Sequence, residues 1–326
     1  MSCKILGIGN ALVDVLVKID DESIFQKYGL IKGGMEMIDA SMKRSIHEEI
    51  IHYEQTVQCG GSTANTIFGL AKLGATAGYI GKIAHDTMGT LFKNDMENAG
   101  TSTHFLYSEI DTGIATTFIT SGGERTFATY LGAAATMSPQ EMYKEVFENY
   151  DLIHVEGYLV FNRELILEIC RLAKACGLKI SMDMASYNIV EQMHDLFEEL
   201  LRDYVDIIFA NEDEAKAFTG KEEHEAVEKL SEYCSVVVVK LGERGSIVKI
   251  DGEVTDIPAV KANCIDTTGA GDIFASGFLY GYTNRLPVKE IGKIASLLGA
   301  ESVQTIGAHL SDTQWEKLLN LHVQYL

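Results

Sequence analysis

The most informative stretch of this sequence is Asp266-Thr267-Thr268-Gly269-Ala270-Gly271-Asp272 (DTTGAGD). Its glycines allow a tight turn and a close approach of the backbone to a ligand, and the apolar residues from Ile273 onward predict a helix. The first amides of that helix would point into the turn, where they can bind an anion. A carboxylate at Asp272 is unfavourable there unless it takes a proton from a hydroxyl that attacks phosphorus. The alternative is that Asp272 only caps the helix.

The composition is that of a globular protein with a strong acidic excess. The chain has 326 residues, and 47 acidic against 27 basic side chains give a net charge of −20. This length predicts one large domain with an appendage or two unequal domains. The negative charge argues against nucleic acid and anionic membranes as partners. An anionic ligand must be held by local amides, a few basic residues or a metal, so Mg²⁺ is expected beside any nucleotide.

The six cysteines are scattered without metal-ligand or CxxC spacing, so we expect reduced thiols. An apolar run begins at Ile5, but Asn10 and Asp14 interrupt it, and no later run approaches the length of a membrane span. We therefore expect a cytoplasmic protein. Its oligomeric state could be monomer or homodimer.

Strand and helix patterns alternate along most of the chain, which predicts a mostly parallel sheet covered by helices on both faces. Two strand-rich segments, at about 11–41 and 103–132, interrupt this alternation, and Gly122-Gly123 suggests a hairpin turn in the second. We expect these insertions to pair into a small lid. Ligands should then bind between the lid and the carboxyl ends of the strands.

Other nucleotide motifs are missing. Gly7-Ile8-Gly9 begins like a dinucleotide fingerprint, but its third glycine would fall at Leu12, and the next element continues as a strand. No Gly-Lys pair is followed by Ser or Thr, so the chain has no Walker P-loop. A nucleotide must be bound in another way.

Two stretches together resemble signatures of the ribokinase-like (PfkB) family of carbohydrate and nucleoside kinases. These are Gly60-Gly61-Ser62-Thr63-Ala64-Asn65 and DTTGAGD, which occur in the order typical of the family. The resemblance extends over nearly the whole chain. It implies a ribokinase-like domain over 1–326, with a three-layer α/β/α fold and a small β-sheet lid, and it implies a kinase that uses ATP and Mg²⁺.

The resemblance also assigns roles to individual residues. Asp272 corresponds to the catalytic base, and the amides of Gly269, Ala270 and Gly271 correspond to the anion hole. Gly60-Gly61 is similar to the hinge on which the lid closes. Asp14 and Asn65 match positions that hold sugar hydroxyls, and a carboxylate and an amide can together grip a diol. Without the resemblance, Asp14 could be an exposed strand residue and Asn65 an ordinary residue in the first turn of a helix.

The expected ATP site combines three motifs. Asn211-Glu212-Asp213-Glu214 matches the family's NxxE motif, with Asn211 at ATP and Glu214 at Mg²⁺ through water, although a capping box explains the same spacing. Lys240, Gly242 and Gly245 resemble a nucleotide-binding turn, or else an ordinary turn into a hairpin. Thr267 completes the ATP contacts. Asp266 and Thr268 could hold a monovalent cation such as K⁺ through carbonyls.

The nearest branch of the family is that of the adenosine kinases. Gly9-Asn10-Ala11-Leu12-Val13-Asp14 and Glu124-Arg125-Thr126-Phe127 are similar to its opening motif and its lid strand. Asn10 then joins the acceptor site, and Arg125 would reach the transferred phosphate, unless it merely pairs with Glu124. Apolar and aromatic contacts to a purine are expected from Leu12, Met37, Phe127 and Tyr158.

The predicted function is transfer of the γ-phosphoryl group of ATP to the 5′-hydroxyl of a ribonucleoside, with adenosine converted to AMP. The insertions carry few basic residues, which argues against an acceptor that already bears a phosphate. A ribose-type or other sugar kinase is the alternative within the family. A nucleoside-binding sensor without catalysis is the alternative of another class.

Overall fold

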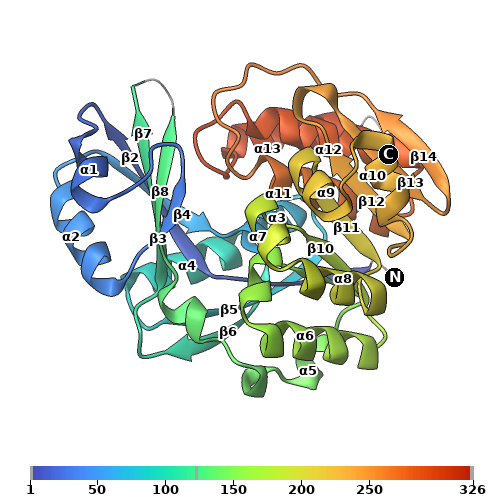
Figure 1. Cartoon of the computed structure of the whole chain (residues 1–326), viewed down its shortest axis with the longest axis horizontal. Helices are drawn as coiled ribbons and strands as arrows, with labels where there is room; N and C mark the ends of the chain where they lie inside the picture. Colours follow the sequence, from blue (N-terminus) through green and yellow to red (C-terminus); the bar gives the residue numbers. More distant parts are fainter. Residues whose placement is uncertain (1–2, 122–123, 324–326) are drawn as a thin grey trace.

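The computed structural model describes residues 3–121 and 124–323, and within those ranges nine strands form the larger of two sheets (Figure 1). Seven neighbouring strands run parallel, and a hairpin adds two antiparallel strands at one edge. Their order is β14 (Glu253–Ile257), β13 (Ser246–Ile250), β12 (Val236–Lys240), β11 (Ile207–Asn211), β10 (Lys179–Asp183), β9 (Leu152–Val155), β1 (Lys4–Ile8), β5 (Thr76–Ala84) and β6 (Ser102–Ser108).

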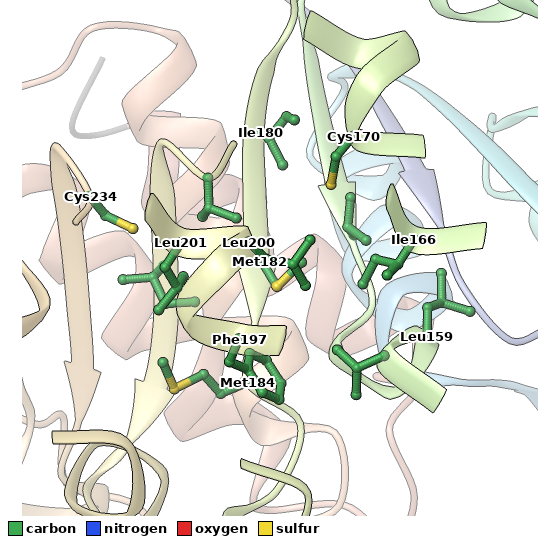
Figure 2. Packing of buried hydrophobic residues seen from close by; sticks show 14 of the residues in the cluster. Leu159, Ile166, Cys170, Ile180, Met182, Met184, Phe197, Leu200, Leu201 and Cys234 are labelled. Atoms are coloured by element: carbon green, nitrogen blue, oxygen red, sulfur yellow. The ribbon is translucent and has the colours of Figure 1, made fainter. Parts of the chain in front are cut away.

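One face of this sheet is covered by the helices of the middle of the chain. Ile180 and Met182 of β10 point into this layer, where Ile166, Phe197 and Leu200 of the covering helices pack against the sheet (Figure 2). The alternation of side chains along β10 makes this packing possible. The helices are α5 (Lys144–Phe147), α6 (Arg163–Ala175), α7 (Tyr187–Gln192), α8 (His194–Asp203), α9 (Glu212–Thr219) and α10 (Glu223–Leu230).

The opposite face carries the remaining large helices. Phe209 of β11 and Val238 of β12 point to this side and pack with Phe278 and Ile67 in one core. The helices are α3 (Ser62–Lys72), α4 (Thr87–Asn98), α11 (Ala270–Thr283) and α12 (Val288–Ser302), and α13 (Asp312–Val323) packs outside them through Trp315. The predicted α/β/α layering is therefore confirmed. Among the described residues, no helix is both long enough and apolar enough to cross a membrane.

Five strands of the described chain form the second, smaller sheet beside the large one (Figure 1). Its order is β3 (Met35–Met37), β8 (Arg125–Tyr130), β7 (Gly113–Thr120), β2 (Leu12–Ile19) and β4 (Gln55–Gly60). Helices α1 (Ser23–Tyr28) and α2 (Ala40–Ile50) supply Phe25 and Ile46 to the core behind it. The predicted small sheet exists, so the fold class holds for both sheets.

The extent of the small sheet differs from the expected insertions at about 11–41 and 103–132. Strand β6 pairs in parallel with β5 in the large sheet, because α4 returns the chain to that sheet as an ordinary β-α-β crossover. Strand β4 pairs with β2 and so extends the first segment of the small sheet to Gly60. The hairpin turn expected at Gly122-Gly123 lies outside the described residues.

Short 3₁₀ turns connect several of the strands and helices. Pro139–Glu141 is such a turn, with a capping box between Ser138 and Glu141, and α5 begins at Lys144. Three further 3₁₀ turns occur at Gly132–Thr136, Gly157–Phe161 and Gly242–Arg244.

Helices α3 and α11 approach each other unusually closely. A Cβ atom built on Gly69 of α3 would lie 2.5 Å from Oγ and 2.8 Å from Cβ of Ser276 in α11. Such separations are shorter than van der Waals contact, so only glycine permits this helix spacing. The first turns of the two helices are joined by hydrogen bonds from Ser62 and Asn65 to Asp272.

We predict that Gly69→Ala lowers the free energy of unfolding by about 1–3 kcal/mol, because the added methyl group forces α3 and α11 apart. Urea unfolding midpoints measure the change. Gly299→Ala is the matched control, since its Cβ would meet no atom closer than 3.6 Å, and it should be neutral or stabilise by up to about 1 kcal/mol. Equal midpoints for the two variants would contradict this description of the packing.

Candidate active site

The DTTGAGD stretch forms the predicted turn and helix start. Gly269 has φ 70° and precedes α11, and a Cβ atom on it would lie 2.3 Å from Cβ of Ala308. A Cβ atom on Gly271 would lie 2.9 Å from Nζ of Lys240. Gly269 therefore requires glycine, both for its left-handed backbone and for space, whereas a side chain at Gly271 would displace the ammonium group of Lys240.

Asp272 is held by α3 and makes no cap for its own helix. Ser62 Oγ donates to one carboxylate oxygen at 2.7 Å, and Asn65 Nδ2 donates to the other at 2.9 Å. The N-cap residue is Gly269, and no side chain caps the helix. Burial raises the pKa of Asp272 to about 6, although the bonds from Asn65 and Ser62 work in the opposite direction. A base whose pKa lies near neutrality suits proton abstraction.

Asp14 faces the same region from the small sheet. Burial, followed by the charge of Asp272, raises the pKa of Asp14 to about 7. A Cβ atom on Gly60 would lie 2.3 Å from the carboxyl carbon of Asp14, and one on Gly61, where φ is 94°, would lie 2.3 Å from the carbonyl oxygen of Asn10. The glycine pair thus lets the β4–α3 joint pass close to the start of β2.

Glu156 is a site residue that the sequence did not reveal. It follows β9, is 2% exposed, and accepts from Asn10 Nδ2 at 2.5 Å and from Asn10 N at 3.2 Å. Thr63 N also donates to it, at 3.4 Å. Burial raises its pKa to about 7 against these bonds. Asn10, expected at the acceptor, is thereby fixed through its amide nitrogen.

The register of the small sheet places several predicted acceptor residues in one row. Asp14 is paired with Ala115, Ala115 with Thr129, and Thr129 with Met37. Paired residues share a face of a sheet, so Asp14 and Met37 point to the same side. Residues two positions along a strand share that face too, which adds Leu12, Phe127 and Arg125.

Of the predicted nucleobase contacts, only Tyr158 comes from outside the small sheet. It is partly buried in the 3₁₀ turn after β9, and burial raises the pKa of its phenol. Met37 on the small sheet is 56% exposed, so its thioether is accessible.

Arg125 does not pair with Glu124. Its guanidinium forms an ion pair with Asp266 and donates to Thr268 Oγ1, whereas Glu124 is paired with Lys32 at 3.3 Å. Asp266 also accepts from the amides of Thr268 and Gly307, at 2.8 and 2.5 Å. The side chains proposed near a monovalent cation are thus already engaged, and that prediction depends on backbone carbonyls alone. Arg125 connects the small sheet to the DTTGAGD stretch.

A cavity of about 750 Å³ lies beside the glycine turn. All five residues predicted at ATP line it: Asn211, Lys240, Gly242, Gly245 and Thr267. Ala270 and Gly271 line it as well, whereas Asp272 faces Ser62 and Asn65 of α3. The sequence did not point to several of the other lining residues, among them Lys261, Cys264, Phe274 and Ser296. The GAGD turn therefore separates this cavity from the residues predicted at the acceptor.

Asn211 and Glu214 form the capping box that was the alternative explanation of their spacing. Asn211 N and Nδ2 donate to the two oxygens of Glu214, at 2.8 and 2.7 Å, and Glu214 N donates back to Asn211 Oδ1 at 2.8 Å. No group of three or more potential metal ligands occurs among the described residues. Each Glu214 oxygen keeps a lone pair, which fits contact with a metal only through water. Its role at Mg²⁺ stays a prediction.

The α/β/α fold, the glycine turn before α11 and the family match together identify a phosphotransferase that acts on a hydroxyl group. The chain belongs to the pfkB family of carbohydrate kinases, whose model matches residues 29–315.

Named relatives include kinases for different acceptors. The chain is 28% identical over 331 residues to adenosine kinase 2 of Arabidopsis thaliana, covering 93% of this chain and 94% of that protein. It is 31% identical over 243 residues to an uncharacterized sugar kinase of Archaeoglobus fulgidus, covering 74% and 96%. The solved structure of adenosine kinase from Sinorhizobium meliloti matches 100% of both chains with TM-score 0.88 and 32% identity. The ribokinase-like fold is thus confirmed, and the kinase class is common to these relatives.

We predict that the protein loses stability as pH rises through about 7. A carboxyl group whose folded pKa is raised, such as that of Glu156, stabilises the fold most below its unfolded pKa, and this contribution disappears above its folded pKa. When the pH rises from about 6 to about 8, the free energy of unfolding should therefore fall in both proteins. The fall should be roughly 1 kcal/mol smaller for Glu156→Gln than for the wild type.

Urea unfolding at the two pH values measures this difference. His154 and His309, whose pKa values burial lowers to about 4, oppose the trend at low pH, but they act equally in both proteins and cancel. Parallel pH dependences for wild type and variant would show that Glu156 does not titrate near pH 7 in the folded protein, which would contradict the prediction.

Proposed function

We propose that this protein is an ATP-dependent kinase that transfers the γ-phosphoryl group to the 5′-hydroxyl of a ribonucleoside, converting adenosine to AMP. The observation that carries the proposal is the placement of Asp272. Its partly buried carboxylate accepts hydrogen bonds from Ser62 and Asn65 of α3 on the acceptor side, while Ala270 and Gly271 of the same turn line the large cavity. A base and an anion-binding turn then act on opposite sides of one transferred group.

The chemistry follows from this arrangement. Asp272 takes the proton of the 5′-hydroxyl as its oxygen attacks the γ-phosphorus in line, and the bond to the β,γ-bridging oxygen breaks to release ADP. The amides at Ala270 and Gly271 face the charge on the transferred group. Mg²⁺ carried with ATP supplies charge neutralisation on the phosphates. Packing of the small sheet over the acceptor excludes water that would otherwise hydrolyse ATP.

The acceptor side offers partners for ribose hydroxyls. Asn65 Nδ2 is bonded to Asp272, but Asn65 Oδ1 is buried and has no hydrogen-bond partner among the described residues. Such an acceptor atom calls for a donor from a ligand. Asp14 can accept from a hydroxyl pair, and Phe127 and Met37 on the same face can cover a flat purine. The adenosine kinases among the relatives support the same acceptor.

A sugar kinase is the second candidate. Asp14 and Asn65 could grip a vicinal diol on any small sugar, and one relative is named as a sugar kinase. The purine contacts would then be superfluous. A sensor that binds nucleosides without catalysis is the weaker alternative, because it gives no reason for a desolvated base beside an anion-binding turn.

The test is phosphoryl transfer from ATP to a panel of adenosine, inosine, guanosine, ribose, fructose and fructose 6-phosphate, followed with ATP labelled at the γ-phosphate. We expect adenosine to be the best acceptor and the free sugars to react poorly. Transfer to free sugars with none to nucleosides would establish the second candidate instead. An absence of transfer to any acceptor, with nucleoside binding retained, would favour the sensor.

The variant Asp272→Asn tests whether Asp272 is the general base of this transfer. This variant should fold and bind ATP but turn over roughly 10³-fold more slowly, because the hydroxyl loses its general base. Asp312→Asn is the matched control, since Asp312 also occupies the first turn of a helix but is 89% exposed, and its turnover should be unchanged. Normal turnover by Asp272→Asn would remove Asp272 as the base.

A further inference from the structure

Asp183 and Lys240 form a buried ion pair that bridges two strands which are not neighbours. Lys240 Nζ donates to Asp183 Oδ2 at 2.8 Å, and the side chains are 17% and 11% exposed. Asp183 ends β10 and Lys240 ends β12, with β11 between them. The lysine side chain therefore crosses over β11 at the carboxyl end of the sheet, where the cavity lies.

The backbone around Asp183 is built to hold this carboxylate. Met182 and Met184 are fully buried in the core on the other side of the sheet, next to Phe197 (Figure 2), so Asp183 must point away from that core. Ala185 has a left-handed backbone, with φ 68°, and its amide donates to Asp183 Oδ1 at 2.9 Å. Such strain in a residue other than glycine is often retained where it positions a functional group.

Lys240 has a functional neighbour on its other side. It lines the 750 Å³ cavity, and its Nζ lies beside Gly271, only 2.9 Å from where a Cβ would stand. Asp183 is not among the residues that line this cavity. Any influence of Asp183 on a ligand there must pass through Lys240.

The charges around Lys240 explain why it needs a fixed partner. Glu214 and Asp272 face it in addition to Asp183, and their charges raise its pKa against the effect of burial. A lysine has a long, flexible stem and could turn toward any of these carboxylates. The direct hydrogen bond goes to Asp183. A buried ion pair often stabilises a fold no more than apolar residues in its place would. A contribution to stability therefore does not by itself explain why the Asp183–Lys240 pair is present.

We propose that Asp183 is a positioning residue for phosphoryl transfer: it holds the ammonium group of Lys240 beside the GAGD turn, where that group contacts the γ-phosphoryl end of the nucleotide. This inference rests on the proposed function, since it takes the cavity to be the nucleotide site. Asp183 acts only through Lys240.

Steady-state kinetics of Asp183→Asn, Lys240→Met and the double variant test the inference. We expect Asp183→Asn to lower kcat/KM for ATP by about tenfold, the factor to which a charge-assisted hydrogen bond of ordinary strength corresponds. KM for the acceptor should stay within about twofold, because the hydrogen bonds of the Asp183 side chain go to Lys240 and to the amide of Ala185, neither of which is predicted at the acceptor. In the Lys240→Met background, Asp183→Asn should have no further effect. Asp183→Glu should recover part of the loss.

Glu141→Gln is the matched control. It leaves the buried Lys82, otherwise bonded to Glu141 at 2.7 Å, without its carboxylate partner, yet neither residue lines the cavity. It should lower the unfolding midpoint, as Asp183→Asn does, and leave kcat/KM for ATP unchanged. The comparison separates a general effect of an unpaired buried lysine from an effect on the nucleotide.

Two results would overturn the inference: kcat/KM for ATP within twofold of wild type in Asp183→Asn, or an equal additional loss in the Lys240→Met background. Calorimetric titration with ADP separates failure of the proposed function from failure of the role assigned to Asp183. If the wild type binds no ADP, the proposed function and this inference fail together. If it binds ADP and transfers phosphate while the two substitutions act independently, only the role of Asp183 fails.

Discussion

The desolvation of the Asp272 carboxylate between α3 and α11 is the constraint on which the rest of the site depends. Burial raises the pKa of this group to about 6, although the hydrogen bonds from Asn65 and Ser62 act in the opposite direction. Those donors reach it only because α3 and α11 pack at the distance that Gly69 permits. A feature of helix packing thus sets the protonation of a group at the site. A few local groups can also supply an electrostatic field that favours an anion, even in a protein with a net charge of −20.

The two sheets contribute different groups of residues to the candidate site. The large sheet brings the strand ends, the capping box and the glycine turn to the edge of one cavity, and the small sheet presents a row of residues around Asp14. Arg125 joins the two through Asp266 and Thr268. Its guanidinium is therefore bound to the turn that precedes Asp272. If a nucleotide competes with Asp266 and Thr268 for the guanidinium of Arg125, then binding of the nucleotide at the DTTGAGD turn is linked to movement of the small sheet through Arg125.

Much of the fold was predictable because its signals are local. The alternation of strand and helix patterns gives the mostly parallel sheet between two helix layers, and DTTGAGD forms the expected turn before α11. The assignment of β6 to the small sheet was wrong because a short strand has the same local pattern whichever sheet it joins. Asp14 and Asn65 came from resemblance, and the structure places both beside Asp272, whereas Glu156 and Asp183 were missed. A carboxylate after a strand has no signature of its own, and only burial and long-range partners make it part of a site.

The pH dependence of kcat/KM for the acceptor tests the central claim most directly, because it reports the ionisation of the base in the free enzyme. Asp272 must be ionised to accept the proton, so activity should fall as pH decreases through about 6. An acidic limb with that midpoint in the wild type, absent from the residual activity of Asp272→Asn, is the predicted result. A profile that stays level down to about pH 4, the ordinary range of an exposed aspartate, would contradict a desolvated Asp272 as the base.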